Sequence, residues 1–131
     1  MAQEYHSVFL WSIDEFLIDS EQMMNTLGYK RHARLIWDKT NGIAPAFSIR
    51  FCHEYLTWFY KGVFQPVSAQ TKGKFRTVIT EKAREHSRKP DLAYYMINKW
   101  YPFAKCLDVF SREKRLGWDQ WGNEINRYNN E

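Results

Sequence analysis

Two clusters of polar side chains in the last third of the chain have the residue types that bind small anionic or hydroxylated ligands. Residues 84–91 read Arg-Glu-His-Ser-Arg-Lys-Pro-Asp, and a second cluster spans residues 112–124. Arg84 and Lys89 can clamp a carboxylate or a phosphate through charge-assisted hydrogen bonds, or they can belong to a solvated basic turn. Residues 84–124 are therefore the first place to look for a ligand.

The second cluster follows an apolar run, and ligands of α/β sheets bind outside the carboxyl ends of strands. Asn123 and Glu124 combine an amide and a carboxylate, which suits the vicinal hydroxyls of a ribose. Spacing alone favours a loop stabilised by its own polar groups. Trp118 and Trp121 are equally suited to stacking on a base and to closing the edge of the core.

Other parts of the chain contain fewer candidate catalytic or binding residues. His53 and Glu54 are adjacent and can form an acid/base pair, although orienting the preceding loop is the better interpretation. The sequence contains no Cys-x-x-Cys or His-x-x-x-His zinc spacing, no glycine-rich phosphate loop and no nucleophile elbow. It therefore lacks a self-contained catalytic constellation.

The pattern of apolar residues predicts strands that are interleaved with helices, as in an α/β domain with a mixed sheet. Asp14 is expected to cap the first helix, Gly28 to stop it, and Pro90 to occupy the first turn of the second. The expected strands are residues 8–13, 34–37, 53–60, 77–80, 106–110 and 117–123, and residues 38–50 form a long loop. The first helix has an apolar stripe of Phe16, Leu17, Met23, Met24 and Leu27, and the second has Leu92, Tyr95, Met96 and Trp100.

Bulk properties limit the class of protein. The 131 residues suit a single domain, and a net charge of +4 with a pI of about 9.1 is compatible with nucleic acid without being diagnostic. Cys52 and Cys106 lie in apolar runs and are expected to be buried thiols in a reducing cytosol. The sequence shows no signal peptide and no apolar run approaching the roughly 20 residues of a membrane helix, so we expect a cytoplasmic protein without a membrane partner.

Taken in order, these motifs resemble the permuted adenine-N6 methyltransferases, which include messenger-RNA adenosine methyltransferases and many phage DNA adenine methyltransferases. The similarity covers nearly the whole chain and is closest in character to phage or prophage members. It implies an α/β fold: a single domain, an incomplete Rossmann-like methyltransferase fold with a mixed sheet and few helices. The motifs that carry it are residues 8–11, 35–41, 53–54, 61–62, 84–91, 107–112 and 117–124.

The resemblance also implies roles for particular side chains. In the family, S-adenosylmethionine is held partly by a lysine matching Lys89, an arginine matching Arg112, and a polar pair matching Asn123 and Glu124. The loop that matches residues 38–50 lies on the side of the acceptor base. The residues expected to contact nucleic acid or a protein partner are Lys39, Asn41, Arg50, Arg84, Arg88 and Trp118.

One departure from the family bears on both activity and fold. The family's catalytic tetrapeptide, Asp-Pro-Pro-Trp, precedes the strand matching residues 8–13, and this sequence does not contain it. Without it the target amine is not oriented, so methyl transfer loses its positioning. In the family, residues near the tetrapeptide also hold the cofactor, so S-adenosylmethionine binding is expected to be weakened or lost. In the family the tetrapeptide ends a central strand. This strand lies between the strand that matches residues 8–13 and the strand that matches residues 106–110. Either these two strands close up, or a homodimer or hetero-oligomer supplies the strand.

Three functions remain open from the sequence. The first, which the missing tetrapeptide favours modestly, is a non-catalytic phage-derived protein that binds a protein or nucleic acid, for example an inhibitor of a host defence nuclease such as an anti-CRISPR. The second is a subunit of an adenine-N6 methyltransferase, completed by a partner that carries Asp-Pro-Pro-Trp. The third is a decaying gene fragment without a selected function.

Overall fold

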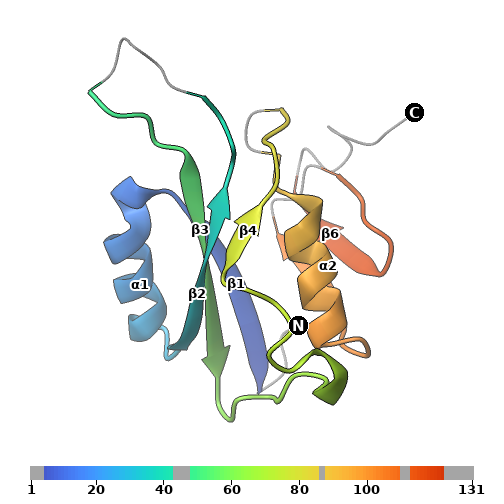
Figure 1. The fold of residues 1–131 in the computed structure, drawn as a ribbon. Coiled ribbons are helices and arrows are strands. Elements are labelled where there is room, and N and C mark those ends of the chain that lie inside the picture. The colour runs from blue at the N-terminus through green and yellow to red at the C-terminus, as the bar shows by residue number, and fades with distance from the viewer. Residues whose placement is uncertain (1–4, 43–47, 86–87, 110–112, 123–131) are drawn as a thin grey trace.

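The computed structural model describes residues 5–42, 48–85, 88–109 and 113–122. Strands are interleaved with helices along this part of the chain, as predicted, and the α/β class with a mixed sheet is confirmed (Figure 1). The elements are β1 (His6–Ser12), η1 (Asp14–Phe16), α1 (Leu17–Thr26), β2 (Lys30–Asp38), β3 (His53–Lys61), η2 (Ala69–Thr71), β4 (Val78–Thr80), α2 (Asp91–Trp100), β5 (Cys106–Val109) and β6 (Trp118–Trp121).

The strands form two separate sheets. A four-stranded sheet has the order β1-β3-β2-β4, in which β3 is antiparallel to β1 and β2 while β4 is parallel to β2. Strands β5 and β6 pair in parallel as a second sheet. The first of the two alternatives, in which β1 and β5 close up directly, is therefore wrong, because β1 ends the larger sheet and pairs only with β3 among the described strands.

The main core lies between the four-stranded sheet and α2. Alternate residues of β2 and β3 point to this face, and their side chains are the large ones that fill it. Helix α2 presents apolar residues at helical spacing against them, as its sequence pattern predicts. The buried set is Leu35, Trp37, Leu56, Trp58, Ile79, Ala93, Met96, Ile97 and Trp100.

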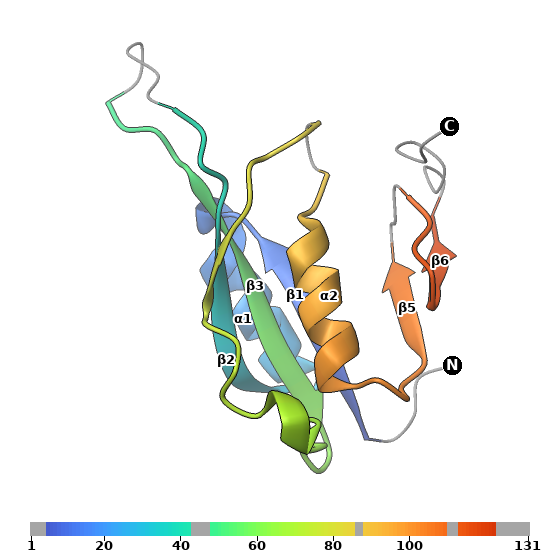
Figure 2. The ribbon, with the colours of Figure 1, turned by 45° about the vertical axis from the view of Figure 1, so that its right-hand side comes forward.

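Among the described helices, α1 lies on the opposite face of the sheet from α2 (Figure 2). Met24 of α1 is buried and Phe59 of β3 is fully buried. Arg31 of β2 reaches Glu21 of α1 with an Nε–Oε1 distance of 3.1 Å, so an ion pair helps to fix the helix on the sheet. No described helix is long and apolar enough to cross a membrane.

Several details of α1 differ from the prediction. Asp14 begins the short 3-10 turn η1 and does not cap α1, whose N-cap is Phe16 without a side-chain hydrogen bond. Gly28 stops the helix as expected, at a φ of 93° that favours glycine. Only part of the predicted apolar stripe is covered, because Phe16, Met23 and Leu27 are each about half exposed.

The prediction that both cysteines are buried is wrong. Cys52 is exposed and precedes β3, while Cys106 is partly buried at the start of β5. Strand β5 alternates between half-buried and exposed residues because one of its faces is uncovered in the described structure.

Strand β2 begins four residues before the predicted start at Arg34, and a bulge lies between Arg31 and Ala33. The extra residue, His32, stacks on Phe64 with ring centroids 4.1 Å apart and meets Trp58 edge-on at 4.6 Å. His32 is exposed overall, and the partial desolvation of its ring against Phe64 and Trp58 lowers its pKa below the ordinary value. A proton on this ring is therefore less favourable in the folded chain than in the unfolded chain.

This environment predicts acid sensitivity. Because the unfolded state binds the proton more readily, the contribution of His32 to the free energy of unfolding should be constant above about pH 7.5 and should become unfavourable as the pH drops below the unfolded pKa of about 6.5. His32→Phe keeps the ring stack without a titrating group. Urea unfolding at pH 8 and pH 5.5 should show a smaller loss for His32→Phe than for the parent chain. An equal loss in both would assign the effect to another group.

Candidate functional site

A buried carboxylate at the start of β3 is the centre of the candidate site. Glu54 is 7% exposed and lies between two lysines from distant parts of the chain. Its Oε1 accepts a hydrogen bond from Lys89 Nζ at 2.8 Å, and its Oε2 accepts one from Lys39 Nζ at 3.1 Å. The site therefore holds two ammonium groups and one carboxylate.

These contacts determine the charge of Glu54. Burial by itself raises the pKa of Glu54, but the hydrogen bonds and positive charges of Lys89 and Lys39 outweigh it and hold the pKa below its ordinary value. The carboxylate is therefore ionised at neutral pH. The three groups together carry one unbalanced positive charge.

The sheet and α2 bring the three side chains together. Asp38 pairs with His53 in the β2–β3 register, so Lys39 lies beside the start of β3. Lys89 precedes Pro90 and the N-terminus of α2. Glu81 fixes that end of the helix, because its carboxylate accepts hydrogen bonds from the backbone N–H groups of Asp91 and Leu92 at 2.9 and 3.0 Å.

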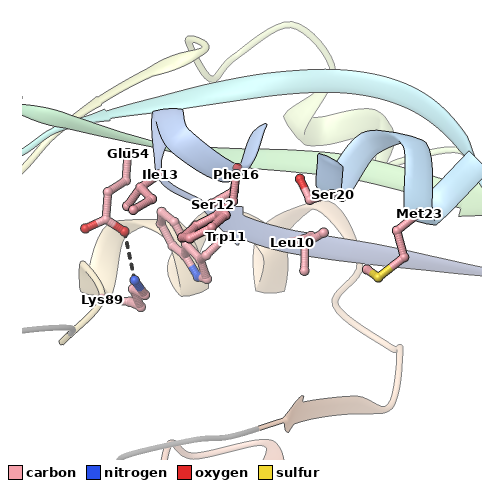
Figure 3. Close-up of a pocket in the computed structure, with 9 residues that line it drawn as sticks. All are labelled: Leu10, Trp11, Ser12, Ile13, Phe16, Ser20, Met23, Glu54 and Lys89. Atoms are coloured by element: carbon pink, nitrogen blue, oxygen red, sulfur yellow. Dashed lines mark hydrogen bonds and ion pairs between the residues drawn. The ribbon is translucent and has the colours of Figure 1, made fainter. Parts of the chain in front are cut away.

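A cavity of about 290 Å³ runs along the outer side of β1 and ends at Lys89 and Glu54 (Figure 3). Lys89 lies over the ring of Trp11, with Nζ 5.2 Å from the centroid. We call this cavity the edge groove. Its lining residues are Leu10, Trp11, Ser12, Ile13, Phe16, Ser20, Met23, Glu54 and Lys89.

The edge groove borders β1 from both of its faces. Leu10 and Ser12 pair with Thr57 and Tyr55 and share a face with them, whereas Trp11 pairs with Leu56 on the opposite face. A cavity lined by residues of both faces must lie along the side of the strand. Apolar side chains form most of the walls of the edge groove, and Lys89 and Glu54 form its charged end.

Of the four predicted cofactor residues, the structure describes only Lys89. Lys89 lies at the charged end of the edge groove. Arg112, Asn123 and Glu124 fall outside the described residues, so their roles stay predictions. Within the described ranges, no group of three or more His, Cys, Asp or Glu side chains is arranged to hold a metal ion.

Two predicted contact residues, Arg84 and Arg88, serve the fold itself. Arg84 donates to both carboxylate oxygens of Asp91 at 3.2 Å. Arg88 donates to both oxygens of Glu113 at 3.1 Å, which raises its pKa. A free anion would have to compete with these carboxylates for either arginine.

The remaining predicted contact residues differ in exposure. Trp118 is half buried, lies edge-on to Tyr94 with centroids 5.2 Å apart, and donates its Nε1–H to Asn98 at 2.9 Å. Trp121 is 57% exposed. Arg50 is exposed, and Asn41 Oδ1 is buried without a hydrogen-bond partner among the described residues. A role for these residues in binding nucleic acid or a partner stays a prediction.

His53 and Glu54 do not face each other. Adjacent residues of a strand point to opposite faces, and His53 Nε2 lies 3.1 Å from the hydroxyl of Tyr55 while Glu54 faces the lysines. Glu54 thus acts as the anchor of two cations. The signal for that role was available in the sequence, because Glu54 is the only acidic residue in the apolar strand, and a buried acid needs a cationic partner.

Replacing the anchor tests this arrangement. Glu54→Gln should lower the free energy of unfolding at pH 7 by roughly 1–3 kcal/mol, because two lysines lose their shared acceptor. The contribution of Glu54 is present above its unfolded pKa of about 4.5 and is lost as the pH falls through its lower folded pKa. Denaturant titrations between pH 3 and pH 7 should therefore show a shallower acid-induced loss in the variant. Asp119→Asn removes an exposed carboxylate of β6 and should match the parent.

Comparison with known proteins identifies the family of the chain. The MT-A70 family profile matches residues 1–124. The chain is 27% identical over 91% of its length to an N(6)-adenosine-methyltransferase MT-A70-like protein of Arabidopsis thaliana, of which it covers 18%. It is 25% identical over 95% of its length to the human N(6)-adenosine-methyltransferase catalytic subunit METTL3, of which it covers 23%.

A bacterial relative is similar as well. The type II methyltransferase M.MunI of a Mycoplasma species is 25% identical over 90% of this chain, which covers 50% of that protein. The chain thus spans between about a fifth and a half of the length of these curated relatives. Because the family profile covers residues 1–124, the chain belongs to the MT-A70 family of adenine-N6 methyltransferases.

Proposed function

We propose that this chain supplies the cofactor-binding part of an S-adenosylmethionine-dependent adenine-N6 methyltransferase. The observation that carries the proposal is the position of Lys89, the lysine that the family resemblance assigns to the cofactor, at the charged end of the edge groove. The names of the relatives, adenosine methyltransferases and a type II methyltransferase, support adenine as the acceptor. Nucleic acid is accordingly the proposed substrate.

The side chains around the edge groove suit the methionine part of the cofactor. Lys89 and Lys39 offer ammonium donors for a carboxylate, and Glu54 offers an acceptor for an amino group. Trp11 and Phe16 supply apolar walls. When bound, S-adenosylmethionine supplies an activated methyl group on sulfonium, and the chain's own task is to hold and orient it.

The acceptor side of the reaction requires groups that the 131 residues lack. Methylation at N6 needs acceptors for the hydrogen bonds of the target amine and a surface on which the base stacks. We assign this task to a segment with Asp-Pro-Pro-Trp, as the resemblance implies. The proposal also places the chain in the cytoplasm, where S-adenosylmethionine is available and exposed Cys52 stays reduced.

The second candidate is the non-catalytic one. The absence of Asp-Pro-Pro-Trp from the sequence supports a phage-derived pseudoenzyme that binds a protein or nucleic acid and inhibits a host defence nuclease, as an anti-CRISPR does. In that case the ion pairs of Glu54 would have only a structural role. Affinity for S-adenosylmethionine separates the two candidates.

Calorimetric titration of the purified chain with S-adenosylmethionine is the decisive measurement. We expect saturable binding that weakens at least tenfold in Lys89→Ala, a loss of about 1.4 kcal/mol. Lys105→Ala removes an exposed lysine away from the groove and should bind like the parent. The chain alone should not methylate an adenine-containing oligonucleotide, and a partner carrying Asp-Pro-Pro-Trp should restore methylation.

Two results would contradict the methyltransferase proposal. One is the absence of S-adenosylmethionine binding both with and without such a partner, which would favour the non-catalytic candidate. The other is equal affinity in the parent and Lys89→Ala, which would place the cofactor elsewhere.

A further inference from the structure

The C-terminal end of α2 lies against chain segments that contain no acidic residue. Residues 55–80 and residues 92–107 both lack Asp and Glu. The two segments meet in the fold, because the backbone N–H of Ser68 donates to the carbonyl of Trp100 at 2.8 Å. Figure 1 and Figure 2 both show η2 beside this end of α2. The charged side chains that these two segments place here are therefore all positive.

The chain turns sharply after η2 and projects two lysines into solvent. The backbone N–H of Lys74 donates to the carbonyl of Thr71 at 3.0 Å. Lys72 has φ −60° and ψ 118°, and Gly73 has φ 73°, which are the angles of a type II turn. Thr71 is buried and donates its hydroxyl to the carbonyl of Ser68 at 2.9 Å. The fold thus holds the turn in place while Lys72 and Lys74 are exposed.

Two more cations lie on the same surface. Arg76 is exposed and follows the half-buried Phe75, whose ring meets that of Tyr95 edge-on with centroids 6.2 Å apart. Lys99 is exposed on α2, and its Nζ lies 5.4 Å from the centroid of the same tyrosine ring. Tyr95 therefore connects the turn to Lys99. We call this surface the basic end, and its cations are Lys72, Lys74, Arg76 and Lys99.

The cations of the basic end differ from the arginines at the other end of α2. Arg84 pairs with Asp91 at 3.2 Å, and Arg88 pairs with Glu113 at 3.1 Å. Within the described ranges, none of the four cations of the basic end takes part in an ion pair. Their charge is therefore not neutralised by the fold and can act on a mobile anion.

A polyanion suits four such cations better than a single small anion does. A nucleic-acid strand carries one phosphate charge per about 3.4 Å of a stacked helix, so it can contact several of them at once. Each contact releases condensed counterions, which gives affinity without any contact to a base. The choice of nucleic acid as the polyanion rests on the proposed function, in which nucleic acid is the substrate.

We propose that the basic end binds the sugar–phosphate backbone of a nucleic acid, outside the site that holds the cofactor. Lys89 precedes the N-terminus of α2, whereas the basic end lies at its C-terminus. The helix has ten residues and is about 15 Å long, so the two sites are well separated. The basic end thus binds nucleotides remote from the cofactor, and this contact is independent of base sequence.

Fluorescence anisotropy with a labelled oligothymidylate of about 15 nucleotides tests the basic end without S-adenosylmethionine. We expect saturable binding at about 50 mM salt. The logarithm of the association constant should fall with the logarithm of the salt concentration with a slope of about −3, as four phosphate contacts on a single strand require. A duplex of the same length is the second arm. Binding of either form supports a backbone contact, and the form bound more tightly identifies the preferred substrate.

Two double variants of equal charge locate the binding surface. Lys72→Gln/Lys74→Gln should weaken binding at least tenfold and make the salt slope shallower by about 1.4. Lys82→Gln/Lys105→Gln removes the same charge from exposed positions outside the basic end and should keep the parent slope. Circular dichroism checks the fold of each variant.

The methyltransferase proposal is tested separately with the same proteins. Lys72→Gln/Lys74→Gln should bind S-adenosylmethionine like the parent, whereas Lys89→Ala should keep its affinity for the oligonucleotide. A failure of cofactor binding therefore leaves the result for the basic end unaffected.

Three outcomes would overturn the proposal for the basic end. The first is that the folded chain binds neither oligonucleotide. The second is an equal loss of affinity in the two double variants, which would attribute binding to net charge alone. The third is that polyglutamate of equal charge binds as tightly and loses affinity in Lys72→Gln/Lys74→Gln, which would make the surface a site for acidic proteins.

Discussion

The buried ion pairs of Glu54 are the interaction on which the candidate site depends. A carboxylate that is 7% exposed is tolerated in the core only because two lysines donate to it. One lysine follows β2 and the other precedes α2, so the same contacts join the loop after β2, the start of β3 and the start of α2. The charge that is left over sits at the end of the edge groove. The same three side chains thus meet a structural requirement of the fold and give the end of the edge groove its charge.

A second set of ion pairs attaches residues 113–115 to the start of α2. Arg115 lies 3.7 Å from the ring centroid of Tyr94 and donates to Asp91 at 2.7 Å. Arg88 and Arg115 both donate to Glu113, at 3.1 and 2.9 Å. Tyr94 donates its hydroxyl to Asp108 of β5 at 3.1 Å, and burial is the main cause of its raised pKa. The small sheet is therefore attached to the larger one mainly through α2, and no strand of the described structure joins them.

Much of the fold was predictable because local patterns determine it. The strands, both helices, the stop at Gly28 and the start of α2 near Pro90 follow from periodicity and from residues with special backbone preferences. The errors concern partners that are distant in sequence. Asp14 was expected to cap α1, but the helix begins three residues after it. Cys52 was expected to be buried, but its neighbours in space leave it exposed. The ion pairs of Arg84 with Asp91 and of Arg88 with Glu113 were not predicted, because these partners are identified only in the folded chain.

For the function, the sequence by itself determined the family and the absence of Asp-Pro-Pro-Trp, and it predicted a role for Lys89. These depend on residue types in order, which a chain displays before it folds. Only the tertiary structure decided that Glu54 joins Lys89 to Lys39, because 35 residues separate Glu54 from Lys89 along the chain and a hydrogen bond of 2.8 Å joins them in space. It also decided that β1 lies at an edge of the larger sheet beside an apolar groove. Strand order is set by which faces and edges can be buried together, and an apolar run such as Val-Phe-Leu-Trp suits a central strand as well as an edge.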